Sequence, residues 1–371
     1  MQFIIKLLLV ILIYSAGEFS AYAEESVQPD NIYFLGLADI HFDPFVNCDS
    51  SGGRCPLIAK LKTAPVNEWP NLLAAAHINS SHIGQDTNYT LLRSALIKAS
   101  KKAQEENAQF VVVLGDMLGH EYRNDYRAYS GDRSYAGYVT FTNKTMAFLT
   151  NELGAAFPDK SVYMVVGNND SYSGDYVSRP REQFFQDTAS MWSRLIKNPA
   201  NKANMQKTFS IAGYYTVQLN PQLRLLVLNT VIFSHKAVGR GSEQAAVSEL
   251  AWLHQQLESA KANNERVLIA MHIPTNIEVY AMSRIYLFKI LGLWKSSFRE
   301  AFQADLKEFA PQIVGVLSGH IHFGWFHINQ DHIPLSGVPA ISPIFGQASK
   351  FKMYDLPPVG SLKEAGTFPV E

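Results

Sequence analysis

Seven side chains of types that bind transition metals follow short apolar stretches of this sequence. They are Asp39, His41, Asp116, Asn168, His272, His320 and His322. Together they offer two carboxylates, one amide and four imidazoles, with no sulfur atom among them. This mixture of nitrogen and oxygen ligands favours Zn, with Mn or Fe as alternatives, and it argues against Ca or a structural thiolate site.

The spacing within two of these stretches places both side chains of a pair on one face. His320 and His322 lie two residues apart in L-S-G-H-I-H-F, as Asp39 and His41 do in D-I-H. Residues two apart in an extended segment point to the same side. A single pair is a weak signal, because loop histidines and turn-forming acids are common on protein surfaces. Five stretches that share this form, however, indicate one common site.

The number of ligands favours two metal ions over one. Seven side chains are too many for a single tetrahedral ion. They suit two ions ~3.5–4 Å apart that share a bridging carboxylate, which is an arrangement used for in-line displacement at phosphorus. The sequence therefore predicts a site for two divalent cations and phosphoryl chemistry.

The elements that must position these residues alternate between strands and helices. Apolar runs predict buried strands at 32–38, 110–114, 162–166, 267–271 and 313–317. Helical spacing predicts helices at 88–104, 140–153, 183–196, 243–262 and 298–309. We also predict a hairpin at 214–228, short strands at 325–328, 333–335, 341–345 and 351–354, and loops at 52–70 and 119–137. This is a mixed α/β pattern, and sites in such folds form at the carboxyl ends of strands.

The composition is that of a globular protein. Of the 371 residues, 47% are hydrophobic and 18% are charged, which allows a sizeable core. The formal net charge of −1 gives no reason to expect a nucleic-acid polymer as a partner. Beyond the N-terminus, no stretch is long and apolar enough to form a transmembrane segment.

The N-terminus has the form of a signal peptide. A mainly apolar run at 3–14 precedes small residues around Ala23. A membrane anchor is the alternative, but the run is shorter than the ~20 residues that a spanning helix needs. We expect cleavage after Ala23, which removes 1–23 and leaves 24–371 as one exported catalytic domain, either secreted or periplasmic.

Two cysteines fit an oxidising compartment. Cys48 and Cys55 flank the short segment D-S-S-G-G-R, which is flexible enough to close into a loop. Free thiols are the alternative. In an exported protein we expect the disulfide.

The ligand motifs resemble those of a known superfamily. D-I-H, G-D, G-N-N-D, M-H-I-P and G-H-I-H occur in the order and spacing of the calcineurin-like metallophosphoesterases, over residues 32–322. The resemblance implies a four-layer α/β/β/α sandwich with a dimetal site at the strand ends. It implies that Asp116 bridges two metals, that Asp39, His41 and His322 hold one of them, and that Asn168, His272 and His320 hold the other.

Within that superfamily the chain is most similar to acid sphingomyelinase-like phosphodiesterases. A-D-I-H-F-D-P-F, G-D-M-L-G-H and I-S-P-I-F-G carry this similarity. It implies that His120 lies beside the phosphate, and that a metal-activated hydroxide attacks a nucleotide, choline-phosphate or sphingomyelin-like ester. A lipid headgroup or another small phosphate ester would then be the partner. The apolar segment 277–294 suits packing, with transient membrane contact as a hypothesis.

One position departs from the superfamily pattern. Where G-N-H is usual this chain has Asn169, which can donate a hydrogen bond but cannot transfer a proton at neutral pH. His120 as the only acid is the favoured explanation. A substrate with a good leaving group is the second, and a site that mainly binds is the third.

Three functions are therefore weighed. An exported dimetal phosphodiesterase comes first. A phosphomonoesterase or nucleotide phosphatase would use the same site. The third is a secreted metal- or phosphate-binding protein that has weak activity because of Asn169. Seven buried polar ligands without a metal would be costly to keep, which weighs against the third.

Overall fold

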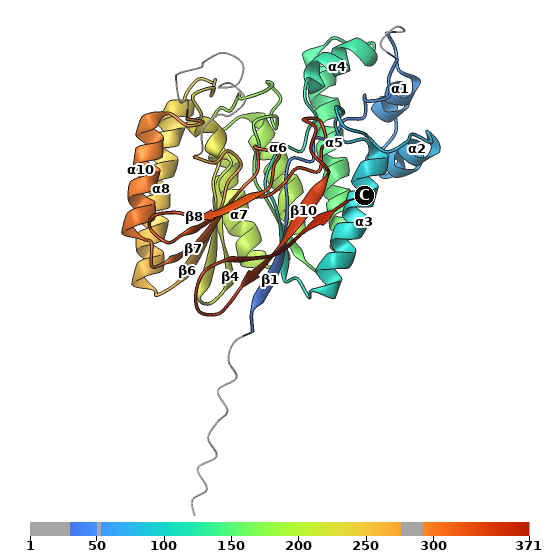
Figure 1. The fold of residues 1–371 in the computed structure, drawn as a ribbon. Coiled ribbons are helices and arrows are strands. Elements are labelled where there is room, and N and C mark those ends of the chain that lie inside the picture. The colour runs from blue at the N-terminus through green and yellow to red at the C-terminus, as the bar shows by residue number, and fades with distance from the viewer. Residues whose placement is uncertain (1–29, 50–52, 276–291, 371) are drawn as a thin grey trace, which may run out of the picture.

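Two β-sheets lie between two layers of helices (Figure 1). The computed structural model describes residues 30–49, 53–275 and 292–370. The predicted signal peptide at 1–23 and most of the apolar segment 277–294 lie outside the described residues. The predicted four-layer α/β/β/α sandwich is confirmed.

The first sheet joins strands from both ends of the described chain, in the order β11-β10-β1-β2-β3. The predicted buried strands β1 (Ile32–Leu37), β2 (Phe110–Val113) and β3 (Ser161–Met164) pair in parallel. On its other side, β1 pairs antiparallel with β10 (Lys350–Leu356), which pairs with β11 (Lys363–Pro369). The carboxyl ends of β1, β2 and β3 therefore reach the same edge.

The second sheet has the order β4-β5-β6-β7-β9-β8. Its strands are β4 (Tyr215–Asn220), β5 (Leu223–Val227), β6 (Arg266–Ala270), β7 (Ile313–Ser318), β8 (Trp325–Ile328) and β9 (Pro334–Gly337). The strands β5, β6, β7 and β9 run parallel, while β4 and β8 pair antiparallel at the edges. The predicted hairpin is the β4–β5 pair.

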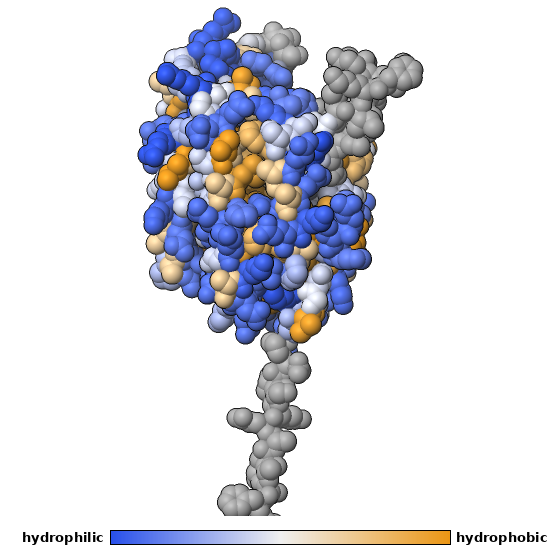
Figure 2. Space-filling model, turned by 90° about the vertical axis from the view of Figure 1, so that its left-hand side faces the viewer, coloured by the Kyte–Doolittle hydropathy of each residue, from blue (hydrophilic) through white to orange (hydrophobic). Residues whose placement is uncertain are grey.

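Long amphipathic helices cover the outer faces of both sheets. On the first sheet lie α3 (Tyr89–Glu105) and α5 (Tyr135–Ala156), and on the second lie α8 (Ser242–Ala262) and α10 (Ser296–Glu308) (Figure 1). The outward face of α8 and α10 is mainly hydrophilic with scattered apolar groups (Figure 2). None of the helices in the described part of the chain is long and apolar enough to cross a membrane.

Several shorter elements differ from the predictions. They include α1 (Pro56–Thr63), η1 (Val66–Glu68), α2 (Trp69–Ala75), α4 (Tyr122–Tyr129), α7 (Pro199–Ala212) and η3 (Thr230–Phe233). The helix predicted at 183–196 is present as α6 (Gln183–Trp192) and η2 (Ser193–Leu195). The predicted loops at 52–70 and 119–137 are wrong, because they contain α1 and α4. Burial explains both: α1 buries Ile58 and Leu61, and α4 buries Tyr122 and Tyr126. The predicted Cys48–Cys55 disulfide is present.

Helix α8 carries an acid with no exposure to solvent. Glu249 is 0% exposed, and its Oε1 accepts a hydrogen bond from the Asn229 backbone N–H at 2.7 Å. Burial raises the pKa of Glu249 well above its usual value, although this hydrogen bond opposes the shift. The folded protein therefore holds a proton on Glu249 at pH values where the unfolded chain has lost it.

Replacing Glu249 with Gln should make the protein less sensitive to alkaline pH. Stability from Glu249 is fully present below its unfolded pKa and is lost as pH rises toward the folded pKa, by at most about 1.4 kcal/mol per pH unit. Gln carries no such proton, so Glu249→Gln should gain stability relative to the wild type as pH rises. Denaturant unfolding at pH 5 and pH 8 measures this. A difference between the two proteins that stays constant with pH would contradict it.

Candidate metal centre

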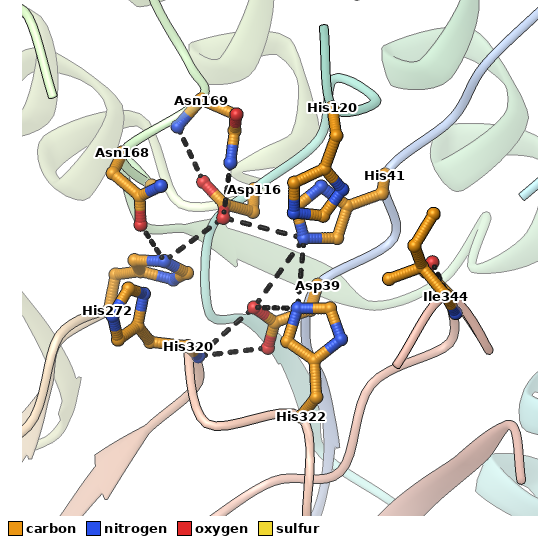
Figure 3. Close-up of polar contacts among 12 residues, drawn as sticks. Asp39, His41, Asp116, His120, Asn168, Asn169, His272, His320, His322 and Ile344 are labelled. Atoms are coloured by element: carbon orange, nitrogen blue, oxygen red, sulfur yellow. Dashed lines mark hydrogen bonds and ion pairs between the residues drawn. The ribbon is translucent and has the colours of Figure 1, made fainter. Parts of the chain in front are cut away.

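The carboxyl ends of five strands meet at one edge of the two sheets. Asp39 and His41 follow β1, Asp116 follows β2, Asn168 follows β3, His272 follows β6, and His320 and His322 follow β7. Figure 3 shows these side chains converging, with His120 and Asn169 beside them. Six of the seven predicted ligands are at most 6% exposed. The structure therefore brings together every site residue that the sequence predicted.

Five of the predicted ligands have left-handed backbone conformations. Their φ angles are 49° at Asp39, 44° at His41, 53° at Asp116, 69° at His320 and 65° at His322. Such angles are uncommon for residues other than glycine, and each costs of order 1–3 kcal/mol. Backbone strain of this kind clusters at functional sites, because surrounding structure must hold it in place.

Hydrogen bonds to the backbone orient two of the imidazoles. Nδ1–H of His41 donates to the Leu118 carbonyl at 3.0 Å, and Nδ1–H of His272 donates to the Leu114 carbonyl at 2.7 Å. Each ring then presents Nε2 to Oδ2 of Asp116, at 3.4 and 3.3 Å. Imidazoles that bind metals typically donate their other N–H in this way. The donor set therefore fits a divalent cation on each side of Asp116.

Asp116 belongs to two separate clusters of ligand atoms. One contains Asp39, His41 and Asp116, and the other contains Asp116, His272 and His320; within each cluster the ligand atoms lie within 4.8 Å of one another. The remaining predicted ligands extend both clusters. Nε2 of His322 lies 3.2 Å from Nε2 of His41, and Oδ1 of Asn168 lies 3.0 Å from Nε2 of His272. The shared position of Asp116 suits a bridging carboxylate.

Burial keeps most of these imidazoles neutral. It lowers the pKa of His41 to about 4 and of His320 to about 3, and it moves the pKa of His322 well below the usual value. Neutral imidazole is the form that binds a metal. Burial also lowers the pKa of His272, but the Asp116 carboxylate outweighs this and raises it. Burial raises the pKa of Asp116, but His272 and His41 outweigh this and hold it well below its usual value.

His120 is paired with an acid that sequence reasoning missed. Its backbone N–H donates to Oδ2 of Asp86 at 2.7 Å, and its Nδ1 lies 3.1 Å from both Asp86 oxygens. Ser342 Oγ–H also donates to Asp86, at 2.8 Å. Burial lowers the pKa of His120, but the bond to Asp86 outweighs this and raises it. The imidazole stacks on His41 with ring centroids 4.0 Å apart, and the edge of Phe345 approaches both His120 and His322.

Asn169 faces the bridging carboxylate. Its backbone N–H donates to Oδ1 of Asp116 at 2.8 Å, and its Nδ2–H donates to Oδ2 at 2.9 Å. Both oxygens of Asp116 therefore have a fixed orientation. The catalytic role predicted for Asn169 stays a prediction, and the geometry favours a positioning role.

Further polar partners hold the loops of the site. Asp170 accepts hydrogen bonds from the backbone N–H groups of Met117 at 2.8 Å and of Gly167 at 2.9 Å. A side chain at Gly167 would place its Cβ 2.1 Å from the Asp116 nitrogen, so only glycine allows this approach. Asp175 accepts from Nδ2 of Asn168 at 2.8 Å, which turns the amide oxygen toward His272. Asp170 is the last residue of the G-N-N-D motif, and its place in that motif is the sequence feature that could have indicated its role.

The sequence matches a known family over most of its length. A sequence model of the calcineurin-like phosphoesterases matches residues 32–324. Sphingomyelinase phosphodiesterase D of Dictyostelium discoideum is 24% identical over 89% of this chain and 72% of its own. Cyclic GMP-AMP phosphodiesterase SMPDL3A of Mus musculus is 24% identical over 85% of this chain and 65% of its own. Sphingomyelinase phosphodiesterase C of Dictyostelium discoideum is 24% identical over 66% of this chain, and the match covers about half of that relative, at 49%.

Solved structures share the fold. A dimetal phosphatase from Danio rerio superposes with a TM-score of 0.53 and 16% sequence identity, covering 92% of this chain and 100% of that one. At this identity the likeness extends to the fold alone. It agrees with the layered arrangement of sheets and helices in Figure 1.

Proposed function

Because the chain belongs to the calcineurin-like phosphoesterase family, we propose that it is an exported phosphodiesterase that uses two divalent cations. The observation that carries the proposal is Asp116, which lies in both ligand clusters. The imidazole of His41, which faces Asp116, stacks on His120 of the His120–Asp86 pair. The proposed substrate is a small diester, such as a nucleotide, choline-phosphate or sphingomyelin-like ester. The phosphodiesterase names of the matched relatives support a diester.

The ligand clusters assign the proposed metal sites. Asp39, His41 and His322 would hold one cation, Asn168, His272 and His320 the other, and Asp116 both. Two bound cations would supply Lewis acidity that activates water and neutralises charge on the phosphoryl oxygens. Zn is favoured over Mn or Fe because the set is rich in imidazole.

His120 is proposed as the group that protonates the leaving oxygen. Its Nδ1–H is engaged by Asp86, so Nε2 is the atom available to the substrate. As water adds to phosphorus and the phosphorus–oxygen bond to the leaving group breaks, the Nε2 proton passes to the departing oxygen. Before this proton transfer, Asp86 stabilises the positively charged imidazole of His120. Asn169 holds Asp116 in place throughout.

Two further proposals concern export and domain organisation. We propose that 1–23 is a signal peptide, which would make the mature chain secreted or periplasmic. We also propose that 24–371 is one catalytic domain, since β10 pairs with β1 and ties the two ends of the described chain together. Transient membrane contact through 277–294 stays a hypothesis.

A comparison of simple esters tests the proposed function. The protein from Glu24 onward is stripped of metal, reloaded with Zn or Mn, and assayed with bis-p-nitrophenyl phosphate and p-nitrophenyl phosphate. Preferred turnover of the diester is the expected result, and preferred turnover of the monoester would favour the phosphomonoesterase. Bound metal without turnover of any ester, including nucleotide and choline esters, would favour the binding protein.

Replacing Asp86 with Asn should impair esters with poor leaving groups selectively. A hydrogen bond to a charged group is worth about 1.5–3 kcal/mol, so turnover of an alkyl ester should fall about 10- to 100-fold. A p-nitrophenyl ester needs no protonation, so its turnover should change much less. Rates for matched alkyl and aryl diesters measure this ratio. Equal losses on both would indicate that Asp86 has only a structural role.

A further inference from the structure

A cavity opens beside the proposed metal centre. It has a volume of ≈ 170 Å³, and its walls include Gly119 and Asn169, which neighbour His120 and Asn168 in the sequence. The proposed mechanism does not use this cavity. Because Asn169 turns its amide toward Asp116, its side chain is committed to the carboxylate. A substrate group attached to a phosphate at the metal centre can therefore extend past Asn169 into the cavity.

Arg123, on α4, is the one cationic side chain among the described residues that line the cavity. Its guanidinium carbon lies 5.7 Å from the ring centroid of Tyr135 and 5.8 Å from that of Tyr138. Stacking on aromatic rings fixes the plane of a guanidinium and leaves its edge N–H groups available. Among the residues that the structure describes, no carboxylate lies within ion-pair distance of Arg123.

Both acids of the cavity wall already accept a hydrogen bond from a side-chain amide. Glu121 accepts a hydrogen bond from Nδ2 of Asn124 at 2.5 Å, and Asp175 accepts from Nδ2 of Asn168 at 2.8 Å. Asp175 is thereby occupied in orienting a predicted metal ligand. Within the described part of the chain, Arg123 is the charged group of the cavity wall that has no hydrogen-bonding partner, so its guanidinium is the group there that can donate to an anion.

We propose that this cavity is a specificity subsite, in which Arg123 binds a second anionic group of the substrate, such as a further phosphate or a carboxylate. The planar guanidinium can donate two parallel hydrogen bonds to either group. The inference rests on the proposed phosphodiesterase function and narrows it to diesters whose second arm carries a negative charge. It makes Arg123 a residue that selects the substrate and takes no part in bond cleavage.

Two p-nitrophenyl diesters that differ only at the end of the second arm test this proposal. The second arm ends in a phosphate in one diester and in a hydroxyl group in the other. Both diesters are made with a two-carbon linker and with a four-carbon linker. The measured quantity is the ratio of kcat/KM for the phosphate arm to that for the hydroxyl arm. Arg123→Gln should lower this ratio about 10- to 100-fold, because a charge-assisted hydrogen bond to the anion is lost.

Two companion variants separate charge from folding. Arg127→Gln makes the same chemical change one turn further along α4, where the side chain is exposed, and it should keep the wild-type ratio. Arg123→Lys keeps the charge but loses the planar donor pair, so its ratio should lie between those of the wild type and Arg123→Gln. This variant also keeps the test valid if Arg123→Gln fails to fold.

The outcomes distinguish this inference from the function on which it rests. An unchanged ratio in Arg123→Gln or Arg123→Lys, with the hydroxyl-arm diester still turned over, would overturn the subsite alone. An equal fall of the ratio in Arg127→Gln would also overturn the subsite, because the loss of any positive charge on α4 would then explain the effect. Absence of turnover of both diesters by the metal-loaded wild type would overturn the proposed function and this inference with it.

Discussion

Replacing Asp116 with Asn is expected to lower diester turnover by a factor on the order of 10³ or more and to reduce the bound metal. Asp116 lies in both ligand clusters, so its loss affects both proposed metal positions at once. A neutral amide cannot bridge two cations as a carboxylate does. Its NH₂ group would face either the Asn169 backbone N–H that now donates to Oδ1, or the Asn169 amide and the imidazole nitrogens that now face Oδ2.

The measurement combines kinetics with metal analysis. Turnover of bis-p-nitrophenyl phosphate and metal content per chain are determined for Asp116→Asn, for the wild type and for Asp305→Asn. The last is a matched control, because Asp305 pairs with His254 in the outer helix layer. Asp116→Asn with normal metal content and normal turnover would show that Asp116 does not bridge the metals.

Replacing His120 with Gln should produce a loss that depends on the leaving group. For an alkyl diester we expect a fall of about 10²–10⁴-fold, the usual contribution of a general acid. For a p-nitrophenyl ester the loss should be much smaller, because that leaving group departs without a proton. Gln keeps a polar side chain of similar length, so the change mainly removes the transferable proton.

The control for this variant is another histidine that pairs with an acid. His254 donates through Nδ1 to Asp305 at 2.8 Å in the outer helix layer, and His254→Gln should leave both rates unaltered. The rate ratio between alkyl and aryl esters is the decisive quantity. If His120→Gln slows both esters by the same factor, His120 binds the phosphate and some other group supplies the proton.

The strands that carry the ligands were predictable because their sequences are uniformly apolar. A strand such as Phe110–Val113 is buried on both faces, so all of its residues are apolar. This continuous apolar run can be recognised in the sequence without knowing which strands lie beside it. Helix α7 was not predicted, since its buried apolar residues are sparse and Asn198, which caps it through the Asn201 N–H, provides a weak signal. The predicted strand at 341–345 is wrong. Ile341 instead donates its N–H to the Ala38 carbonyl at 3.1 Å, which is a tertiary contact.

The residues of the site also divide into those that the sequence predicts and those that it does not. Each predicted ligand stands directly after an apolar strand, so its motif and its place in the fold coincide. Asp86 reaches His120 from 34 residues away, and Arg123 lines the cavity because the first turn of α4 lies against it. Neither lies within a motif or a periodic pattern. Their roles depend on tertiary packing, which a single sequence does not reveal.

The position of β1 has a consequence for how the chain is made. β1 lies inside the first sheet, between β2 and β10, and β10 comes from residues 350–356. A ribosome completes β1 and β2 long before it reaches β10. Until then the backbone N–H and C=O groups along one side of β1 have no strand partner, and such an open edge can pair with other chains. Closure of this sheet is therefore a late event in biosynthesis, and the edge of β1 stays open to pairing with other chains until that event.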